Sequence, residues 1–217
     1  WLPGLYEELR SFDKDYSAKH GWPESIKLTT CKPNGTLSLL PGVTPGVHPG
    51  YAHYMIRRIQ IASDSPLVKV CKEHGYHVEY RRTFEGADDR STVVVSFPFK
   101  YPENTAIADG FTAVDQLEIV RKLQADWSDN AVSCTVYYSP EELPIVREYL
   151  ATHYNKGFKS ISFMLRSDHG FDQAPFEKIT KEDYNKLVRN TRTITNTKDT
   201  LDFDESMDCE SGACPVR

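Results

Sequence analysis

The chain has 217 residues, of which 39% are hydrophobic and 26% charged, a composition typical of one large globular domain or of a compact domain with a tail. Its formal net charge of −5 argues against general binding to nucleic acid or to an anionic membrane surface. No apolar run approaches the roughly 18 residues that a membrane span requires, and no signal peptide is visible. Because the chain begins at Trp1 rather than Met, we expect it to be cut from something larger.

The first fifty residues predict a helix, a short strand and a long loop. Leucines at near-helical spacing favour a helix over residues 1–20. The sequence SIKLTT predicts a strand over residues 25–30. It leads into residues 31–50, which are rich in Gly, Pro, Ser and Thr.

The next fifty residues predict one strand, one helix and two further strands, over residues 54–62, 65–75, 76–84 and 91–99. The helix has Ser65 as its N-cap and Pro66 as its first residue, and Gly75 ends it. A nearly continuous run of valines in the last strand predicts burial on both faces.

Residues 112–165 predict a regular alternation of helix, strand, helix and strand, over residues 112–130, 131–138, 139–157 and 159–165. The first helix carries one apolar stripe beside charged neighbours. This succession is typical of a parallel sheet or an α/β barrel, because parallel strands require helical crossovers.

The pattern loosens from residue 166 onward. One more helix is predicted over residues 180–190, and residues 191–217 are predicted to form an unstructured arm. From Lys198 to Arg217 this arm holds six acidic residues against two basic ones, with little to bury. We therefore expect a segment 1–190 followed by a flexible tail 191–217.

The five cysteines fall into two groups. Cys31, Cys71 and Cys134 lie in apolar surroundings and are expected to be buried thiols. Cys209 and Cys214 form a C-x₄-C pair in the tail, whose spacing permits a small disulfide ring that opens by exchange with another dithiol. The alternatives are a solubilising tail that happens to contain cysteines, or half of a zinc site without its other ligands. Nothing indicates a secreted disulfide framework, so we expect a cytoplasmic protein and no metal site.

The stretch KPNGTLS, residues 32–38, is a second candidate site. It offers a lysine, backbone amides near a glycine, and two hydroxyls, and a helix opening after Pro33 would direct free N–H groups at an anion. It lacks the Walker spacing. Taken alone, a plain Pro-Asn-Gly turn is favoured over a phosphate cradle.

Several other polar residues invite a role. His48 and His53 are expected to be hydrogen-bonded structural histidines rather than ligands of a substrate or cofactor. Arg57 and Arg58 fall on opposite faces of a strand, so at most one points inward, and the pair is expected to be solvated or ion-paired. Trp127 and Asp129 are expected to pack and cap, and His169 has no identifiable partner.

Three stretches together resemble the C-terminal third of the monomeric, adenosylcobalamin-dependent (class II) ribonucleotide reductases. They are TTCKPNGTLSLLPGVTPGVHPGYAHYMIRRIQI, WSDNAVSCTV and the tail CESGACPVR, and they occur in the order of the family. The resemblance implies an α/β fold, the C-terminal part of a ten-stranded α/β barrel followed by a flexible tail. AVSCTV and KSISFML would be the last barrel strands.

The resemblance also implies roles for particular residues. Cys209 and Cys214 match the tail pair that re-reduces the active-site disulfide and is itself recharged by thioredoxin. The phosphate-binding loop of the family is matched by Asn34, Gly35, Thr36 and Ser38. Where class I enzymes carry a Tyr-Tyr pair for radical transfer, this chain has Ser162 and Phe163, which fits radical generation in place by adenosylcobalamin.

The family's radical cysteine lies in an Asn-Pro-Cys-Gly-Glu string, which this chain lacks. We therefore interpret the chain as a fragment or one piece of a split reductase, with the upstream part as partner. The complete enzyme would abstract the ribose 3′-hydrogen with a thiyl radical, while a dithiol supplies two electrons as the 2′-hydroxyl leaves as water. Its substrates would be ribonucleotides, in this family mostly triphosphates, and its products the deoxyribonucleotides for DNA replication. The alternatives are a non-catalytic assembly or regulatory module and a stand-alone thiol-disulfide exchange protein.

Overall fold

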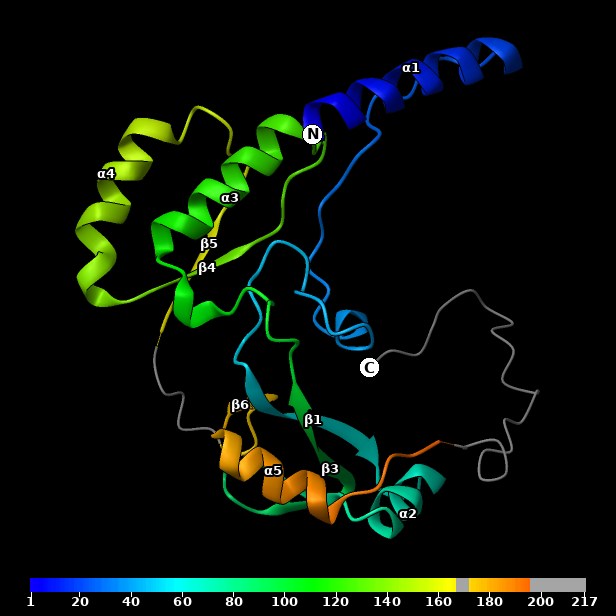
Figure 1. The fold of residues 1–217 in the computed structure, drawn as a ribbon, viewed down its shortest axis with the longest axis vertical. Coiled ribbons are helices and arrows are strands. Elements are labelled where there is room, and N and C mark those ends of the chain that lie inside the picture. Colours follow the sequence, from blue (N-terminus) through cyan, green and yellow to red (C-terminus); the bar gives the residue numbers. More distant parts are fainter. Residues whose placement is uncertain (167–171, 196–217) are drawn as a thin grey trace. The chain divides into compact units, whose positions relative to one another are not determined.

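The computed structural model describes residues 1–166 and 172–195. The chain divides into two compact units (Figure 1). Unit 1 is formed by Trp1–His53 and Lys100–Gly170, and unit 2 by Tyr54–Phe99 and Phe171–Arg217. Each unit therefore combines two stretches that are distant in sequence. None of the helices that the structure describes is long and apolar enough to cross a membrane.

Unit 1 contains three of the five predicted helices, α1 Leu2–His20, α3 Ala113–Asp126 and α4 Leu143–His153. Thr112 and Asp115 form a capping box at the start of α3, which satisfies two backbone amides. The helix ends earlier than the predicted residue 130. The Gln124 side chain donates to the carbonyls of Ser128 and Asn130, at 2.6 and 3.0 Å, and holds the chain in a turn there.

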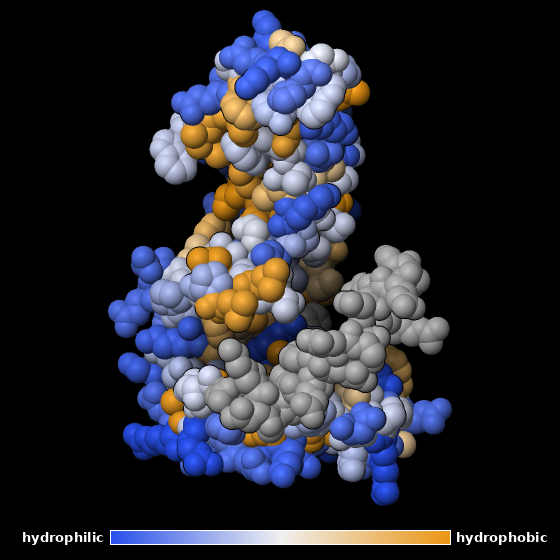
Figure 2. Space-filling view, turned by 90° about the vertical axis from the view of Figure 1, so that its right-hand side faces the viewer, coloured by the Kyte–Doolittle hydropathy of each residue, from blue (hydrophilic) through white to orange (hydrophobic). Residues whose placement is uncertain are grey.

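The sheet of unit 1 is a parallel pair, β4 Thr135–Tyr138 and β5 Ser162–Leu165, joined by the turn η3 Pro140–Glu142 and by α4. Thr135 pairs with Ser162 and Tyr138 with Leu165. The predicted β-α-β succession is confirmed. All four residues of β5 are exposed, including three large apolar ones, and Figure 2 shows apolar patches open to solvent on one face of the molecule.

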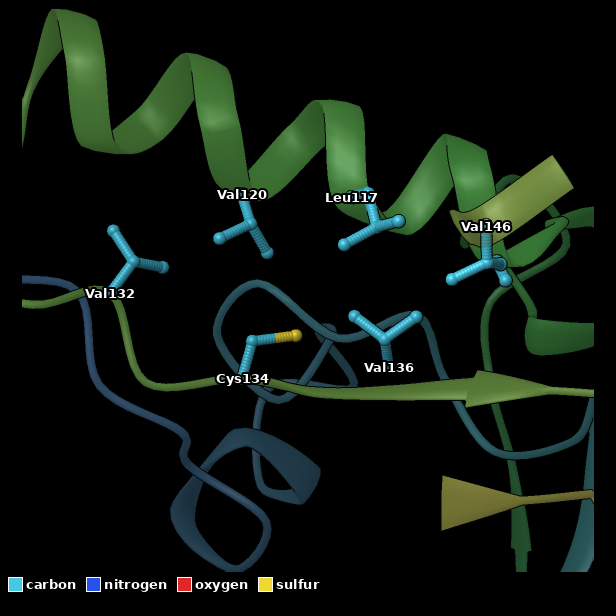
Figure 3. Close-up of a cluster of buried hydrophobic side chains, with 7 residues drawn as sticks. Leu117, Val120, Val132, Cys134, Val136 and Val146 are labelled. Carbon is cyan, nitrogen blue, oxygen red and sulfur yellow. The ribbon is translucent and has the colours of Figure 1, made fainter. Parts of the chain in front are cut away.

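The core of unit 1 lies between α3 and β4. Leu117 and Val120 point from the helix toward Val132, Cys134 and Val136 on the chain below (Figure 3). Val146 of α4 completes the cluster. The predicted apolar stripe of α3 is thus the face that packs on the parallel strands.

Unit 2 is built on a four-stranded sheet with the strand order β2-β3-β1-β6. The strands are β1 Tyr54–Ala62, β2 His77–Arg82, β3 Asp88–Lys100 and β6 Phe176–Lys178. The pairs β2–β3 and β1–β6 are antiparallel. Two helices, α2 Pro66–Glu73 and α5 Lys181–Asn190, accompany it. The side chains of Val93, Val94 and Val95 are all buried, as their run predicts.

One predicted strand is absent, a second is shorter than predicted, and one strand was not predicted. Residues 25–30 form no strand, because the amides of Leu28 and Thr29 donate to the Asp129 carboxylate instead of a ladder. The strand predicted over 131–138 is regular only in its second half. The three-residue β6 is too short to leave a sequence pattern.

Candidate functional site

Three extended segments of unit 1 run parallel to one another. The Asn130 amide donates to the Thr29 carbonyl at 3.2 Å, and the Ser133 amide to the Cys31 carbonyl at 3.4 Å. On the other side, the Ser162 amide donates to the Cys134 carbonyl at 3.3 Å, where β5 begins. The loop that starts at Lys32 therefore leaves the carboxyl end of an extended segment, the edge at which α/β folds bind ligands.

Two of the predicted loop residues, Asn34 and Ser38, shape the loop itself. The Asn34 side-chain oxygen accepts the Leu37 amide at 3.1 Å, and the Ser38 hydroxyl donates to the Asn34 carbonyl. Ser38 is only 3% exposed. The helix that follows is the short 3₁₀ turn η1 Leu37–Leu39 rather than an α-helix, so the loop offers no long helix dipole.

The other two, Gly35 and Thr36, present free donors. Both residues are exposed, and their amides donate to no acceptor among the residues that the structure describes. Nothing lies within 4 Å of the position that a Cβ on Gly35 would take. Lys32 is exposed just before them. Two amides, a hydroxyl and an ammonium group at one turn can together bind an oxyanion.

Gly46 packs closely against the backbone of Lys32, where the loop begins, a contact that the sequence did not predict. Its φ is +73°, and a Cβ there would lie 2.5 Å from the Lys32 carbonyl oxygen, so only glycine fits. The return of the chain across Lys32 is a long-range contact. The repeated glycines of residues 42–50 were the only signal of it in the sequence.

His48 fastens the loop region to the sheet. Its Nε2 accepts the Thr135 amide at 3.0 Å, while Nδ1 lies 3.2 Å from the Pro45 carbonyl. Because Nε2 accepts, Nδ1 is the ring nitrogen placed to donate to the Pro45 carbonyl. The prediction of a hydrogen-bonded structural histidine is confirmed.

Asp129 joins α1, the extended segment before the loop and the end of α3. Its carboxylate accepts the Tyr6 hydroxyl at 2.7 Å and the Leu28 amide at 2.7 Å, and Arg10 lies 3.9 Å away. The Leu28 hydrogen bond, with smaller contributions from Tyr6 and Arg10, holds the pKa of Asp129 below its usual value. Asp129 caps backbone amides as predicted, but across a hundred residues rather than locally.

The three cysteines of the described chain are free. Burial raises the pKa of Cys31 and of Cys71, and it raises the pKa of Cys134 to about 11, with a smaller contribution from Cys31. Their thiols therefore stay protonated and poorly nucleophilic. The prediction of a buried thiol is confirmed for Cys71 and Cys134, whereas Cys31 is only half-buried, at the edge of the core of unit 1.

The remaining predicted residues lie in unit 2 or outside the described chain. Arg58 pairs with Glu177 and donates to the Ala174 carbonyl, so it is ion-paired as expected. The Arg57 guanidinium lies over the Phe176 ring, 4.4 Å from its centroid. Cys209, Cys214 and His169 lie outside the described residues. The described part of the chain contains no group of three or more His, Cys, Asp or Glu residues that could hold a metal ion.

The sequence model of the family "Ribonucleotide reductase, barrel domain" matches residues 10–164. An adenosylcobalamin-dependent ribonucleoside-triphosphate reductase of Levilactobacillus brevis is 36% identical over 98% of this chain and 30% of its own length. A probable enzyme of the same name from Dictyostelium discoideum is 34% identical over 100% of the chain and 29% of its own length. The crystal structure of a B12-dependent (class II) ribonucleotide reductase superposes with a TM-score of 0.76 at 34% identity, over 89% of this chain and 27% of that one. The chain thus spans less than a third of the length of these relatives.

Proposed function

The chain belongs to the ribonucleotide reductase family, with its residues 10–164 in the barrel domain, and we propose that it is the C-terminal part of an adenosylcobalamin-dependent enzyme that reduces ribonucleoside triphosphates. In this proposal the chain contributes two functions. The loop of Asn34, Gly35, Thr36 and Ser38 binds the substrate phosphates, and Cys209 with Cys214 delivers reducing equivalents.

The proposal rests on one observation, that some polar groups of the loop bond within the loop while others remain free to bind a ligand. The side chains of Asn34 and Ser38 form hydrogen bonds with the loop's own backbone, while the amides of Gly35 and Thr36 remain available and exposed. A preformed turn with free amides binds a phosphate without reorganising, which lowers the entropic cost of binding. Its place at the carboxyl end of a parallel segment also supports the proposal, because this is the edge at which barrel enzymes bind their substrates.

The proposed reducing step is a thiol-disulfide exchange. When the 2′-hydroxyl leaves as water, two electrons come from an active-site dithiol, which becomes a disulfide. A thiolate of the Cys209–Cys214 pair attacks that disulfide and forms a mixed disulfide. The second tail thiol resolves it, so that the active-site dithiol is restored and the tail pair is oxidised. An external dithiol protein of the thioredoxin class then reduces the tail.

Adenosylcobalamin is assigned to the complete enzyme rather than to these residues. It would supply the initiating radical when bound. The described part of this chain offers no cluster of metal-ligating side chains, and the sequence contains no Asn-Pro-Cys-Gly-Glu string for the radical cysteine. No residue of the described chain is therefore assigned to the cofactor.

The partner that completes the barrel is, in this proposal, the upstream part of the reductase. β5 belongs to a parallel pair, and parallel strands are normally covered on both faces. Here Phe163, Met164 and Leu165 are all exposed. Large apolar residues outside the strand, such as Phe12 and Ile26, are exposed as well. Such surfaces are typical of a chain whose neighbours lie elsewhere in a longer protein.

The test is Cys209→Ser in the complete reductase, or in this chain combined with the upstream part. We expect multiple turnover with thioredoxin to be abolished, because the tail can no longer form its disulfide. A single turnover should be preserved, because the active-site dithiol is intact. A small dithiol that reduces the active site directly should restore multiple turnover. Retained thioredoxin-driven turnover would contradict the shuttle, and an inactive combination of the two parts would favour a non-catalytic module.

A further inference from the structure

Unit 2 contains a pocket of about 380 Å³ at the place where its two helices end beside the sheet (Figure 1). The ends of α2 and α5 meet there, since a Cβ on Gly75 would lie 2.1 Å from the Asn190 carbonyl oxygen. Both helices and the strands β1, β2 and β3 contribute residues to the lining. We call it the α2–α5 pocket. Its volume falls within the range of about 300–1,000 Å³ that is typical of small-molecule sites.

The walls of the α2–α5 pocket are largely apolar. Ile56 of β1, Val78 of β2, Pro98 of β3 and Leu187 of α5 all line it. Each of these four residues is only partly buried. A ligand that covers them would remove apolar surface from water, which favours binding. The pocket therefore suits a ligand with an apolar body.

Four polar residues line the same pocket, Lys72, Tyr76, Ser96 and Asn190. Their side chains form no hydrogen bond and no ion pair with any residue that the structure describes. Each of them can donate a hydrogen bond, and Lys72 adds a positive charge. Burial raises the pKa of Tyr76, with a smaller contribution from Cys71, so its hydroxyl keeps its proton. The pocket thus combines apolar walls with several available donors.

The charges around the pocket favour an anionic ligand. Among the described residues that line it there is no aspartate or glutamate. His77 lies in the lining, with its Nε2 3.7 Å from the carboxylate of Glu79. The negative end of α2 would oppose an anion. However, Arg192 donates to the carbonyls of Glu73 and His74, at 2.6 and 2.8 Å, and so compensates that end of the helix.

A second, smaller pocket makes a useful comparison. It has a volume of about 110 Å³ and shares Lys72 and Val78 with the α2–α5 pocket. Its lining includes the carboxylate residue Glu79, which would repel an anion. Its volume also lies below the usual range of ligand sites. Of these two neighbouring pockets, the α2–α5 pocket is therefore the one that suits an anion with an apolar body.

We propose that the α2–α5 pocket binds a small aliphatic monocarboxylate. The carboxylate accepts hydrogen bonds from the Lys72 ammonium group and from the side chains of Ser96 and Asn190, while the aliphatic body covers Ile56 and Leu187. A carboxylate is an acceptor only, so it matches a lining whose available polar groups can all donate. This site is independent of the proposed reductase function.

The test is a titration of the full chain with sodium hexanoate, followed by amide chemical shifts. We expect saturable shifts at residues that line the pocket, such as Gly75, Val78 and Leu187. Hexan-1-ol and hexylamine have the same body, but they cannot form the charge-assisted bond with Lys72 and should bind about tenfold more weakly. Each methylene removed between hexanoate and butyrate should weaken binding about fourfold, because less apolar surface is buried.

Substitutions identify the position of the carboxylate. Lys72→Met keeps the aliphatic stem and removes the charge, so the Kd for hexanoate should rise about five- to tenfold while that for hexan-1-ol stays the same. Lys69→Met is the matched control, since Lys69 is an exposed lysine of the same helix that lies outside the lining, and it should leave both Kd values unchanged. Leu187→Trp should fill the pocket and abolish the binding of both ligands.

Three results would overturn the proposal. One is the absence of saturable shifts at the lining residues. Another is equal affinity for hexanoate, hexan-1-ol and hexylamine, which would mean that the pocket does not select a carboxylate. The third is an equal effect of Lys72→Met and Lys69→Met on the Kd for hexanoate. None of these results depends on thioredoxin-driven turnover in Cys209→Ser, so a failure of this proposal is distinguishable from a failure of the proposed function.

Discussion

The two units hold their backbones together in different ways. In unit 2 the thirteen-residue strand β3 lies between β2 and β1, and it forms a long backbone ladder with β2 that one register shift, between Tyr80 and Arg81, interrupts. In unit 1 the regular parallel pair has only four residues in each strand. Besides isolated backbone bonds, its neighbouring backbone is held by polar side chains, among them those of His48, Gln116, Gln124 and Asp129.

This difference bears on the candidate site, because the loop at residues 32–38 belongs to unit 1. A ladder distributes its stability over many equivalent bonds, so the loss of one is tolerated. When single side chains hold the backbone, no equivalent bond compensates for the loss of one of them. We therefore expect single substitutions in unit 1 to have larger effects than chemically matched substitutions in unit 2.

The largest expected effect concerns two glutamines that make the same contact in the two units. The Gln116 side chain, 4% exposed, donates to the Tyr137 carbonyl and accepts the Tyr137 amide, both at 3.1 Å. Gln173 makes the equivalent contacts with the Tyr80 carbonyl and the Arg82 amide at the exposed edge of β2. Gln116→Met should lower the free energy of unfolding by about 2–3 kcal/mol, because two interior backbone groups lose their partners.

Gln173→Met is the matched control. Water can replace the lost bonds at that exposed edge, so we expect a change within about 0.5 kcal/mol. Urea unfolding of both variants, with amide exchange at Tyr137 and Arg82 as local reporters, measures the difference. Equal losses in the two variants would show that the units do not differ in the way we describe.

The elements that sequence predicted well are those with local signals. Ser65, Pro66 and Gly75 mark the ends of α2, and the valine run marks β3. The absent strand at residues 25–30 could not be predicted, because Asp129 intercepts its amides from a hundred residues away. The Thr135 amide likewise donates to the distant His48 ring, and β4 is regular only from Thr135 onward. The spacing of apolar residues indicates which positions are buried. It does not indicate which backbone amides will bond to a side chain instead of to a neighbouring strand.

The candidate site was predictable in position but not in the roles of its residues. The composition of residues 32–38 and the family resemblance indicated Asn34, Gly35, Thr36 and Ser38. Which of them shape the turn and which keep free donors depends on side-chain directions that no spacing rule determines. The contact of Gly46 with Lys32 and the bond from the Thr135 amide to His48 are likewise tertiary.

The second prediction concerns the shape of the loop. Asn34→Ala removes the acceptor of the Leu37 amide, a capping contact of about 1 kcal/mol. If the turn must be preformed to bind phosphate, the KM of the complete reductase for its nucleotide should rise about fivefold, with kcat nearly unchanged. Asn185→Ala, at an exposed position on α5, is the matched control and should leave KM as it is. A fall in kcat at constant KM would assign Asn34 to the chemistry rather than to binding.

The smallest expected effect concerns one acidic residue in each unit and its contribution to the pH dependence of stability. In unit 1, hydrogen bonds from Arg121 first and from Tyr149 second lower the pKa of Glu118 to about 2. In unit 2, the Thr180 hydroxyl and Lys186 lower the pKa of Asp183. A lowered folded-state pKa adds stability above the unfolded value, about 4.3 for glutamate, and this stability is lost as the pH falls toward 2. Glu118→Gln should therefore make the urea midpoint fall less steeply between pH 5 and pH 2 than in the parent chain.

Asp183→Asn should flatten the same profile by a smaller amount, because Asp183 is half exposed and its partners are local to one helix turn. The network of Glu118 instead joins α3 to α4 through the Tyr149 hydroxyl. Raising the salt concentration should reduce both effects, and that of Asp183 the more, since solvent ions screen exposed charges best. A larger flattening in Asp183→Asn would mean that local exposed pairs, and not contacts between elements, dominate the acid stability of this chain.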